Sequence, residues 1–384
     1  MRIGVPKEIK ILENRVGLTP ASVHELVAHG HDVVVEHAAG QGIGLDDTAY
    51  RDAGATIAAN AADVFLTADM IVKVKEPQAE ERARLRPGQV LFTYLHLAPD
   101  PEQTKDLVAS GTICIAYETV TAATGGLPLL APMSEVAGRM AVQAGAHFLE
   151  KPNGGKGILL GGVPGVAPGR VVILGGGVVG THAAMIAIGM GADVTVLDRS
   201  PEAMRALWRQ FGSALKTEFS TRAAVEHHVA GADLVVGGVL IPGASAPKLV
   251  SAAMIRTMQP GSVIVDVAID QGGCFETSHA TTHADPTYVV DGVVHYCVAN
   301  MPGGVPRTST FALNNATLPF TLALADKGWR RALAEDSHLR NGLNVASGHV
   351  TCRPVAEALG YKYVAADDVL HQGSDLIHED AARA

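Results

Sequence analysis

One stretch of the sequence limits the fold more than any other: residues 171–192 are 22 consecutive residues without Asp, Glu, Lys or Arg. A run of this length is long enough to cross a bilayer as a helix. However, six of these residues are glycine, and Gly175 to Gly177 are consecutive, which would interrupt a membrane-spanning helix. We therefore predict a buried strand, a tight turn and a buried helix here.

The turn in this run has the pattern GxGxxG, formed by Gly175, Gly177 and Gly180. In such units the first glycine permits the turn, the second lets a pyrophosphate approach the backbone, and the third lets helix and strand pack closely. Asp198 ends the next predicted strand, where a carboxylate accepts hydrogen bonds from a ribose 2′-hydroxyl and repels a 2′-phosphate. The sequence therefore predicts a Rossmann-type domain that binds NAD rather than NADP, although the adjacent Arg199 would soften that repulsion.

The composition indicates a large globular protein that does not bind nucleic acid. At about 150 residues per domain, a chain of 384 residues predicts two large domains. Acidic residues outnumber basic ones by 39 to 30, and the resulting net charge of −9 disfavours contact with a phosphate backbone. Apolar residues make up 47% of the chain, which excludes a disordered protein.

The cysteine and histidine patterns indicate neither a disulfide framework nor a metal site. The four widely spaced cysteines lack a CxxC pattern, and we expect them to be reduced and buried. They are Cys114, Cys274, Cys297 and Cys352. The first residues show no secretory signal, so we expect a cytoplasmic protein without a membrane partner. His279 and His283 are four residues apart, but the segment around them lacks helical periodicity, so we expect no metal.

The first third of the chain alternates strand-like and helix-like segments, which is typical of a doubly wound, mostly parallel sheet. The predicted helices are Pro20–Ala28, with Thr19 as N-cap, and Pro101–Ser110. The predicted strands are Arg2–Val5, Asp32–Glu36, Met70–Lys75, Val90–His96 and Thr112–Glu118. The fold class is therefore α/β.

A second such series follows a connecting helix, predicted at Ser134–Lys151, and a loop rich in Gly and Pro at Asn153–Gly169. Its predicted strands are Arg170–Leu174, Asp193–Leu197, Asp233–Gly237, Ser262–Ala268 and Val293–Ala299. From Ser309 to about Ala334 the pattern is helical, and we expect it to pack back on the first domain. This predicts a discontinuous substrate domain, 1–130 with 305–384, and an NAD-binding Rossmann domain, 131–304.

Polar side chains follow the predicted strands at their carboxyl ends, where open α/β sheets bind ligands. In the first domain these are Arg15, Lys75, His96 and Glu118, and in the second Asp270 and Asn300. We expect the two sheet edges to face each other across an interdomain cleft. Each residue also has an ordinary structural interpretation: a solvated basic residue, a core histidine, or an aspartate that caps a turn.

Several motifs together resemble a known family. They are residues 2–8 (RIGVPKE), 14–16 (NRV), 73–77 (KVKEP), 94–98 (YLHLA), 133–139 (MSEVAGR), 175–180 (GGGVVG), 265–273 (VDVAIDQGG) and 299–303 (ANMPG). These motifs extend over essentially the whole chain. They are similar to those of the alanine dehydrogenase family, which lies in a wider group with the NAD-binding subunit of proton-translocating transhydrogenase.

The resemblance implies NAD-dependent, reversible oxidative deamination of L-alanine to pyruvate and ammonia. It implies that Arg15 and Lys75 bind the substrate, that His96 is the acid/base, and that Asp270 organises the attacking water or ammonia. It also implies a homo-hexamer. Beyond the glycine turn and Asp198, the NAD contacts it implies are Ser134, Val178, Val179, Ser220, Val239, Leu240, Val267, Asp270, Val298, Asn300 and Met301.

Two positions depart from the family pattern: Ala203 stands where a Lys or Arg is usual, and His279 where an Arg is common. Both departures concern the adenosine side of the cofactor rather than hydride transfer. Three alternatives remain open at this stage. They are a transhydrogenase subunit, a saccharopine-type dehydrogenase with a larger substrate, and a module that senses NAD without turnover.

Overall fold

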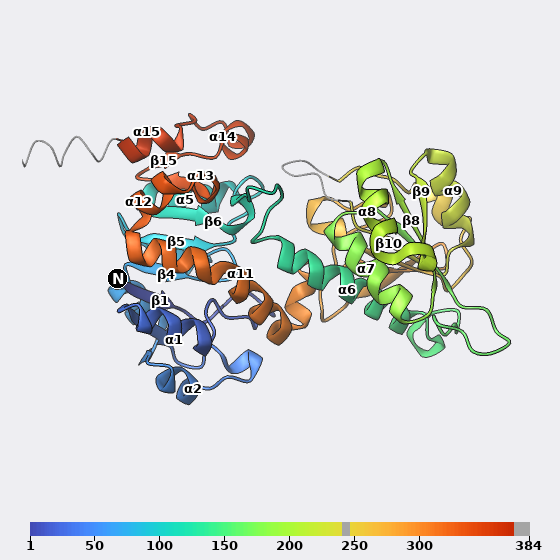
Figure 1. Cartoon of the computed structure of the whole chain (residues 1–384), viewed down its shortest axis with the longest axis horizontal. Helices are drawn as coiled ribbons and strands as arrows, with labels where there is room; N and C mark the ends of the chain where they lie inside the picture. The colour runs from blue at the N-terminus through green and yellow to red at the C-terminus, as the bar shows by residue number, and fades with distance from the viewer. Residues whose placement is uncertain (240–245, 372–384) are drawn as a thin grey trace, which may run out of the picture. The chain divides into compact units, whose positions relative to one another are not determined.

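The computed structural model describes residues 1–239 and 246–371, and these form two compact units. Unit 1 consists of Met1–Pro132 and the chain from Val305 onward, and unit 2 of Met133–Gly304. The chain therefore leaves unit 1 once and returns to it, as Figure 1 shows by colour.

Unit 1 contains an eight-stranded, mostly parallel sheet. In spatial order the strands are β15 (His349–Val350), β14 (Leu343–Ala346), β6 (Ile113–Ala116), β5 (Val90–Thr93), β4 (Met70–Val72), β1 (Arg2–Val5), β2 (Asp32–Glu36) and β3 (Thr56–Ala58). The six strands from the first part of the chain are parallel to their neighbours, whereas β14 pairs antiparallel with β6 and β15. The returning chain thus extends this sheet.

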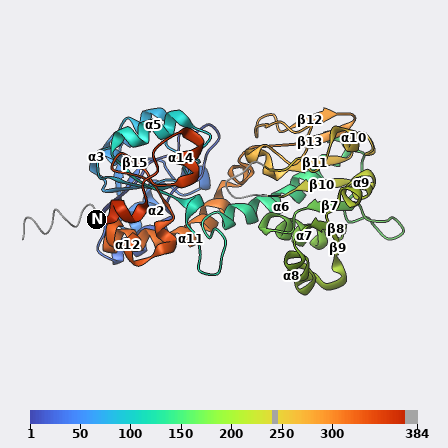
Figure 2. The same ribbon diagram turned by 90° about the horizontal axis from the view of Figure 1, so that it is seen from above.

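Helices cover both faces of this sheet (Figure 2). On one face α3 (Ala61–Thr67), α5 (Pro101–Ser110) and α14 (Arg353–Leu359) share a core with the strands, while α1 (Pro20–Ala28), α11 (Pro306–Lys327) and α12 (Trp329–Glu335) cover the other. The remaining elements are short. They are η1 (Gln41–Ile43), α2 (Asp47–Asp52), α4 (Ala79–Arg82), η2 (Tyr117–Thr119), α13 (Ser337–Arg340) and α15 (Ala366–His371).

Unit 2 contains a seven-stranded sheet. Its order is β12 (Thr287–Val290), β13 (Val293–Tyr296), β11 (Val263–Asp266), β10 (Leu234–Gly237), β7 (Arg170–Leu174), β8 (Asp193–Asp198) and β9 (Lys216–Phe219). Among the described strands of this second sheet, only β12 and β13 pair antiparallel. Both sheets are therefore mostly parallel, and the predicted α/β class is confirmed.

The core of unit 2 has two layers, one on each face of the sheet. Val171 and Ile173 of β7 pack with α6 (Ala131–Phe148), α7 (Val178–Gly189) and α8 (Pro201–Phe211). Val172 and Leu174 point to the other face, toward α9 (Arg222–Gly231) and α10 (Ala252–Ile255). This alternation buries β7 on both sides, as a central parallel strand requires. Short 3₁₀ turns complete the unit: η3 (Lys151–Asn153), η4 (Gly212–Ala214), η5 (Val267–Gln271) and η6 (Met301–Gly304).

The uncharged run 171–192 folds as predicted, into β7, a turn and α7. Within residues 1–239 and 246–371, no helix is both long and apolar enough to cross a membrane.

Several predicted boundaries need correction. The strands predicted to reach Lys75, His96 and Glu118 end at Val72, Thr93 and Ala116. The connecting helix starts at Ala131, because a proline in the first helical turn loses no hydrogen bond there, and it ends at Phe148. The predicted single helix from Ser309 starts at Pro306 and breaks at Gly328, whose φ of +72° lies outside the helical region.

Both sheets change winding direction at one point. In unit 1 the chain continues from β1 to β2 and β3 on one side, and then to β4, β5 and β6 on the other. In unit 2 the corresponding change lies between β7 and β10. In open α/β sheets such switch points open a crevice beyond the carboxyl strand ends, which is the usual ligand position.

Asn314 of α11 joins the returning chain to the first part of unit 1. This asparagine is 2% exposed, and its Oδ1 accepts hydrogen bonds from the Thr19 N–H (2.7 Å) and the Ser22 hydroxyl (3.0 Å). Its Nδ2 donates to the Gly17 carbonyl at 3.1 Å. One side chain therefore provides hydrogen-bond partners for three groups of the loop that leads into α1 and of its first turn.

Replacing Asn314 by Ala leaves buried polar groups of this loop without partners. We expect a destabilisation of about 3 kcal/mol. The urea unfolding midpoint at fixed protein concentration measures this loss. Asn341→Ala is the control, because the exposed Asn341 makes a surface hydrogen bond to Thr121, and its midpoint should hardly change. Equal midpoints for the two variants would contradict the prediction.

Candidate active site

The glycines of the turn after β7 have three different surroundings. Gly175 has a φ of +99°, a conformation that residues with a Cβ rarely adopt. A Cβ on Gly180 would lie 1.8 Å from the Gly175 carbonyl oxygen, so the close approach of helix and turn excludes any larger residue. A Cβ on Gly177 would meet no atom of residues 1–239 and 246–371 within 4 Å, so among these residues the backbone there borders open space.

This open space lies at the start of the 12-residue helix α7. Gly177 is its N-cap and offers no side chain to the first-turn N–H groups, and no acidic residue lies in the first turn. The first N–H groups of a helix have no intrahelical acceptor and carry partial positive charge. The turn therefore fits the pyrophosphate of a dinucleotide, both in shape and in charge.

Asp198 lies where the sequence predicted, at the end of β8. Its carboxylate accepts the backbone N–H groups of Gly176 and, at 2.6 Å, of Ser200. The acid therefore holds the glycine turn, and its further lone pairs remain suited to a ribose hydroxyl. Ser220 lies beside it, since its N–H donates to the Asp198 carbonyl at 2.9 Å.

The predicted NAD contacts at the end of β10 divide into a described and an undescribed part. A Cβ on Gly175 would lie 3.0 Å from Val239 Cγ2, so the ends of β7 and β10 are adjacent. Leu240 lies outside the described residues. Val178 is exposed and Val179 is buried, and Ser134 on α6 is half-buried.

Asp270 and Asn300 come together at the ends of β11 and β13. Asp270 is exposed on η5, and its Oδ2 accepts the Asn300 N–H at 3.4 Å. Asn300 has a φ of +60°, and His283 Nε2 lies 3.2 Å from its carbonyl oxygen. The structure thus places the predicted acid beside a predicted NAD contact.

Three other predicted contacts at this edge are less accessible. Val298 is 0% and Met301 3% exposed, and both belong to the core cluster of unit 2. Val267 is half-buried against the same cluster. A cofactor contact at Val298 or Met301 therefore requires the backbone, because their side chains are covered.

Asp266 fixes the loop that follows Asp270. It is 0% exposed, and its carboxylate accepts the N–H groups of Cys274 (2.9 Å) and Phe275 (3.4 Å). Burial raises the pKa of Asp266, although the hydrogen bond from Ser278 and those from the backbone act in the opposite direction. Sequence reasoning assigned this residue no role, although it is the last residue of β11.

In unit 1, Arg15 lies in the loop after β1 and is only 2% exposed. Its guanidinium pairs with Glu13 through two hydrogen bonds, Nε to Oε1 at 2.7 Å and Nη2 to Oε2 at 2.6 Å. Burial lowers the pKa of Arg15, but the hydrogen bond and the charge of Glu13 outweigh it and raise the pKa overall. Glu13 thus fixes the plane of the guanidinium and keeps it charged.

Lys75 follows β4, and its backbone is held by Glu8. Glu8 Oε1 accepts the N–H groups of Val74 (2.7 Å) and Lys75 (3.3 Å), while Oε2 accepts from Lys73 Nζ at 3.0 Å. Lys73 is 0% exposed and also bonds to Glu81 at 2.7 Å. Burial lowers the pKa of Lys73, but the two carboxylates outweigh it, so this lysine stays charged.

His96 follows β5 in an unusual conformation. Its φ is +48°, its side chain is 45% exposed, and its ring stacks on Tyr94 with an interplanar angle of 4°. Its backbone N–H donates to Glu118 Oε1 at 2.7 Å. An exposed imidazole excludes the core-histidine interpretation of this position.

Glu8 and Tyr94 connect the three predicted residues of unit 1. The charge of Glu8 acts on Arg15, Glu8 also binds the Lys75 N–H, and Tyr94 stacks on His96. Burial raises the pKa of Tyr94, so it remains a neutral phenol, and its hydroxyl donates to the Leu129 carbonyl. Sequence reasoning gave Glu8, Glu13 and Tyr94 no separate role, because each acts through a neighbour.

The structure brings no metal-ligand group together in the described ranges. The ring of His279 stacks on Tyr288 at 3.7 Å, whereas that of His283 faces the Asn300 carbonyl. The two histidines therefore have different neighbours.

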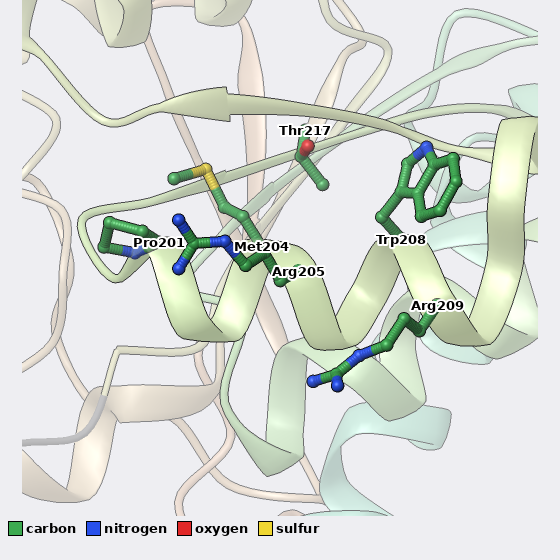
Figure 3. A pocket seen from close by; sticks show the side chains of 6 residues that line it. All are labelled: Pro201, Met204, Arg205, Trp208, Arg209 and Thr217. Atoms are coloured by element: carbon green, nitrogen blue, oxygen red, sulfur yellow. The ribbon is translucent and has the colours of Figure 1, made fainter.

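Figure 3 shows a hollow outside this site, along α8 and the edge strand β9. It is lined by Pro201, Met204, Arg205, Trp208, Arg209 and Thr217. None of these is a predicted site residue.

A glycine turn between the first strand of a parallel sheet and a helix N-terminus, followed by an acid at the end of the next strand, defines a dinucleotide-binding α/β protein. Two family descriptions match this chain: Alanine dehydrogenase/PNT, N-terminal domain, at residues 4–137, and its C-terminal domain at residues 141–353. The chain belongs to this family, which consists of NAD(P)-using dehydrogenases, and it is an oxidoreductase.

Individual relatives agree with this assignment. An alanine dehydrogenase of Halomonas elongata is 62% identical over 370 residues, covering 96% of this chain and 100% of that protein. One from Bacillus subtilis is 57% identical over 98% of this chain and 99% of its own length. A solved L-alanine dehydrogenase superposes with a TM-score of 0.91 at 52% identity, over 94% of this chain and 99% of that one. A transhydrogenase from Sinorhizobium meliloti gives 0.79 at 28% identity, over 92% and 99%.

The glycine geometry predicts different effects of two alanine substitutions. Gly180→Ala forces a Cβ into the Gly175 carbonyl and should destabilise unit 2 by about 2 kcal/mol or more. Gly177→Ala meets open space and an allowed φ of −75°, so its stability should be close to that of the wild type. Thermal unfolding without cofactor measures both. A Gly177→Ala protein that is the less stable of the two would contradict the assigned packing.

Proposed function

We propose that this protein is an NAD-dependent dehydrogenase that converts L-alanine to pyruvate and ammonia, and catalyses the reverse reductive amination. The observation that carries this proposal is the full-length relationship to alanine dehydrogenases at 57 to 62% identity. The glycine turn, with open space at the α7 N-terminus, supports the dinucleotide part independently. Alanine dehydrogenase activity then requires a second group of residues to bind the amino acid.

In this proposal the glycine turn and Asp198 hold the cofactor in unit 2. When bound, NAD supplies the acceptor for the hydride that leaves the alanine Cα. The further cofactor contacts are those implied by the family: Ser134, Val178, Val179, Ser220, Val239, Leu240, Val267, Asp270, Val298, Asn300 and Met301. The carboxylate of Asp198 favours NAD over NADP, because it would repel a 2′-phosphate.

The residues of unit 1 bind and deprotonate the amino acid. Arg15 presents a planar, permanently charged group of the kind that binds carboxylates, and Glu13 orients it. Lys75 stabilises negative charge as it develops on the substrate oxygen. His96 accepts the proton of the amino group, which is the general-base role that histidine most often performs in enzymes.

Asp270 orients the water that attacks the imine carbon after oxidation. Its exposed carboxylate accepts a hydrogen bond from Asn300, which leaves other lone pairs for a water molecule. In the reverse direction the same carboxylate orients ammonia. This division of roles predicts that His96 and Asp270 affect the chemical step more than binding.

The proposal extends to assembly and location. We propose a homo-hexamer, as the family relationship suggests, and mass measurement in solution tests it. We also propose a cytoplasmic protein. The four cysteines support this, because they are free and three of them are buried, as in proteins of a reducing compartment.

Purified protein with L-alanine and NAD should produce NADH, and His96→Ala and Asp270→Ala should each lower kcat by about 100-fold or more. His96→Ala should bind NAD with almost unchanged affinity, because it removes neither the glycine turn nor any of the proposed NAD contacts. NADH absorbance and NAD titration measure these effects.

The same assay separates the alternatives. Wild-type kcat in either variant would remove that residue from the mechanism. Nucleotide binding without turnover on alanine, glycine or serine would indicate a sensor. Hydride transfer between two nucleotides without an amino acid would indicate a transhydrogenase.

Coenzyme choice tests the role of Asp198. We expect kcat/KM with NAD to exceed that with NADP, and Asp198→Asn to narrow the ratio by about tenfold, because the amide removes the like-charge repulsion. Asparagine also keeps an acceptor for the glycine turn. Glu218→Gln on the neighbouring strand β9 is the control, since it removes an exposed carboxylate that pairs with His228. A wild-type preference for NADP would overturn this assignment.

A further inference from the structure

We propose that Glu118 is a positioning residue for His96: it clamps the backbone of residues 95 and 96 and thereby fixes where the imidazole stands. The inference rests on the proposed role of His96 as acid/base and goes one step beyond it. Glu118 itself does not need to contact substrate or cofactor.

The first argument is the hydrogen-bond geometry. Glu118 Oε1 accepts the His96 N–H at 2.7 Å, and both carboxylate oxygens lie 3.2 Å from the Leu95 nitrogen, whose N–H donates to them. These two N–H groups lie beyond the end of β5 at Thr93. The carboxylate therefore takes the place of a neighbouring strand for the last residues before the loop.

The second argument is the backbone conformation of His96. A φ of +48° brings Cβ close to the following carbonyl oxygen, so a residue with a side chain adopts it only when its surroundings compensate. Glu118 supplies a short hydrogen bond from a charged acceptor at this residue. Without this acceptor, we expect the chain at residue 96 to relax to negative φ and to rotate the Cα–Cβ direction.

The third argument is that, among residues 1–239 and 246–371, no hydrogen bond is recorded that holds the imidazole ring itself. Nδ1 of His96 lies 3.9 Å from Glu118 Oε1, which is beyond hydrogen-bond distance. The ring stacks on Tyr94 at a centroid distance of 5.8 Å, and the Tyr94 hydroxyl is tied to the Leu129 carbonyl. Stacking on Tyr94 restrains the tilt of the imidazole ring. The hydrogen bonds from the backbone to Glu118 fix where the ring lies along the face of Tyr94.

The described residues contain a matched clamp away from the site. Ala38 has a φ of +59°, its N–H donates to Asp47 Oδ1 at 2.8 Å, and the neighbouring His37 ring lies 2.6 Å from the same carboxylate. The side chains of Asp47 and Glu118 are similarly buried, at 15% and 14% exposure. Asp47 therefore provides a control with the same local chemistry but no proposed role in the reaction.

The test compares Glu118→Gln with Glu118→Met. Glutamine keeps an oxygen acceptor for the His96 N–H, whereas methionine has nearly the same length and volume but no comparable acceptor. We expect Glu118→Met to lower kcat for alanine oxidation by about 100-fold, since small misplacements of a reacting group cost rates of this order. The KM values for alanine and NAD should change by about twofold or less, and Glu118→Gln should restore kcat to within about threefold of the wild type.

A double-mutant cycle shows whether Glu118 acts through His96. In the His96→Ala background, Glu118→Met should cause no further loss of kcat, because the group that it positions is absent. Asp47→Asn should leave kcat unchanged. Thermal unfolding of each variant confirms that folded proteins are compared, and Glu118→Ala removes the same acceptor if the methionine variant does not fold.

Each outcome has a defined meaning. If His96→Ala retains wild-type kcat, the proposed role of His96 fails, and this inference fails with it. If His96→Ala is impaired but Glu118→Met is not, only the positioning role fails. Equal losses from Glu118→Met in the wild-type and His96→Ala backgrounds would also overturn it, since the effect would then be structural.

Discussion

Just beyond the carboxyl end of a parallel strand, backbone N–H groups no longer have a neighbouring strand to accept their hydrogen bonds. In this protein, carboxylate side chains accept several of these hydrogen bonds instead. Glu8 accepts the N–H groups that follow β4, Glu118 those that follow β5, and Asp266 those of the loop beyond β11. An unpaired buried N–H costs free energy comparable to a lost hydrogen bond. The fold therefore requires these acids, and the same requirement places charged groups at the sheet edges where ligands bind.

The same constraint explains where the backbone is strained. His96 and Asn300 both have positive φ, both follow parallel strands, and both donate their N–H to a carboxylate, Glu118 and Asp270 respectively. Such conformations persist only when the surroundings over-determine them. In each unit a carboxylate thus holds a residue whose backbone has left the extended conformation of the strand. Backbone strain occurs at the proposed site because a side chain directed toward a ligand no longer follows the alternating up-and-down order of side chains in a strand.

The sequence predicted much of this arrangement because apolar runs and glycine spacing are strong local signals. The bounds of β1, β2, β7, α1 and α5 were predicted without error. The strands predicted to reach Lys75 and His96 were too long. Composition does not show at which residue the acceptor of the backbone N–H changes from a neighbouring strand to a carboxylate side chain. The short or exposed strands β3, β9, β12, β14 and β15 were missed, since an edge strand such as Lys216–Phe219 has no apolar run. The paired hydrogen bonds between Glu13 and Arg15 could not be predicted from the sequence, because they depend on the conformation of the loop.

The two units also differ in the source of positive charge at their strand ends. The glycine turn offers neutral backbone dipoles, so the anion site in unit 2 needs no buried cation. Unit 1 contains buried cations, and each is already compensated: Arg15 by Glu13, and Lys73 by Glu8 and Glu81. Buried charges without partners would destabilise the fold, so this pairing lets unit 1 fold without substrate. In the proposed function, the substrate carboxylate meets a guanidinium whose charge Glu13 already partly balances, so its attraction to Arg15 is weaker than to an unpaired cation. That proposal therefore assigns selectivity for a small amino acid to the orientation of these groups rather than to net charge.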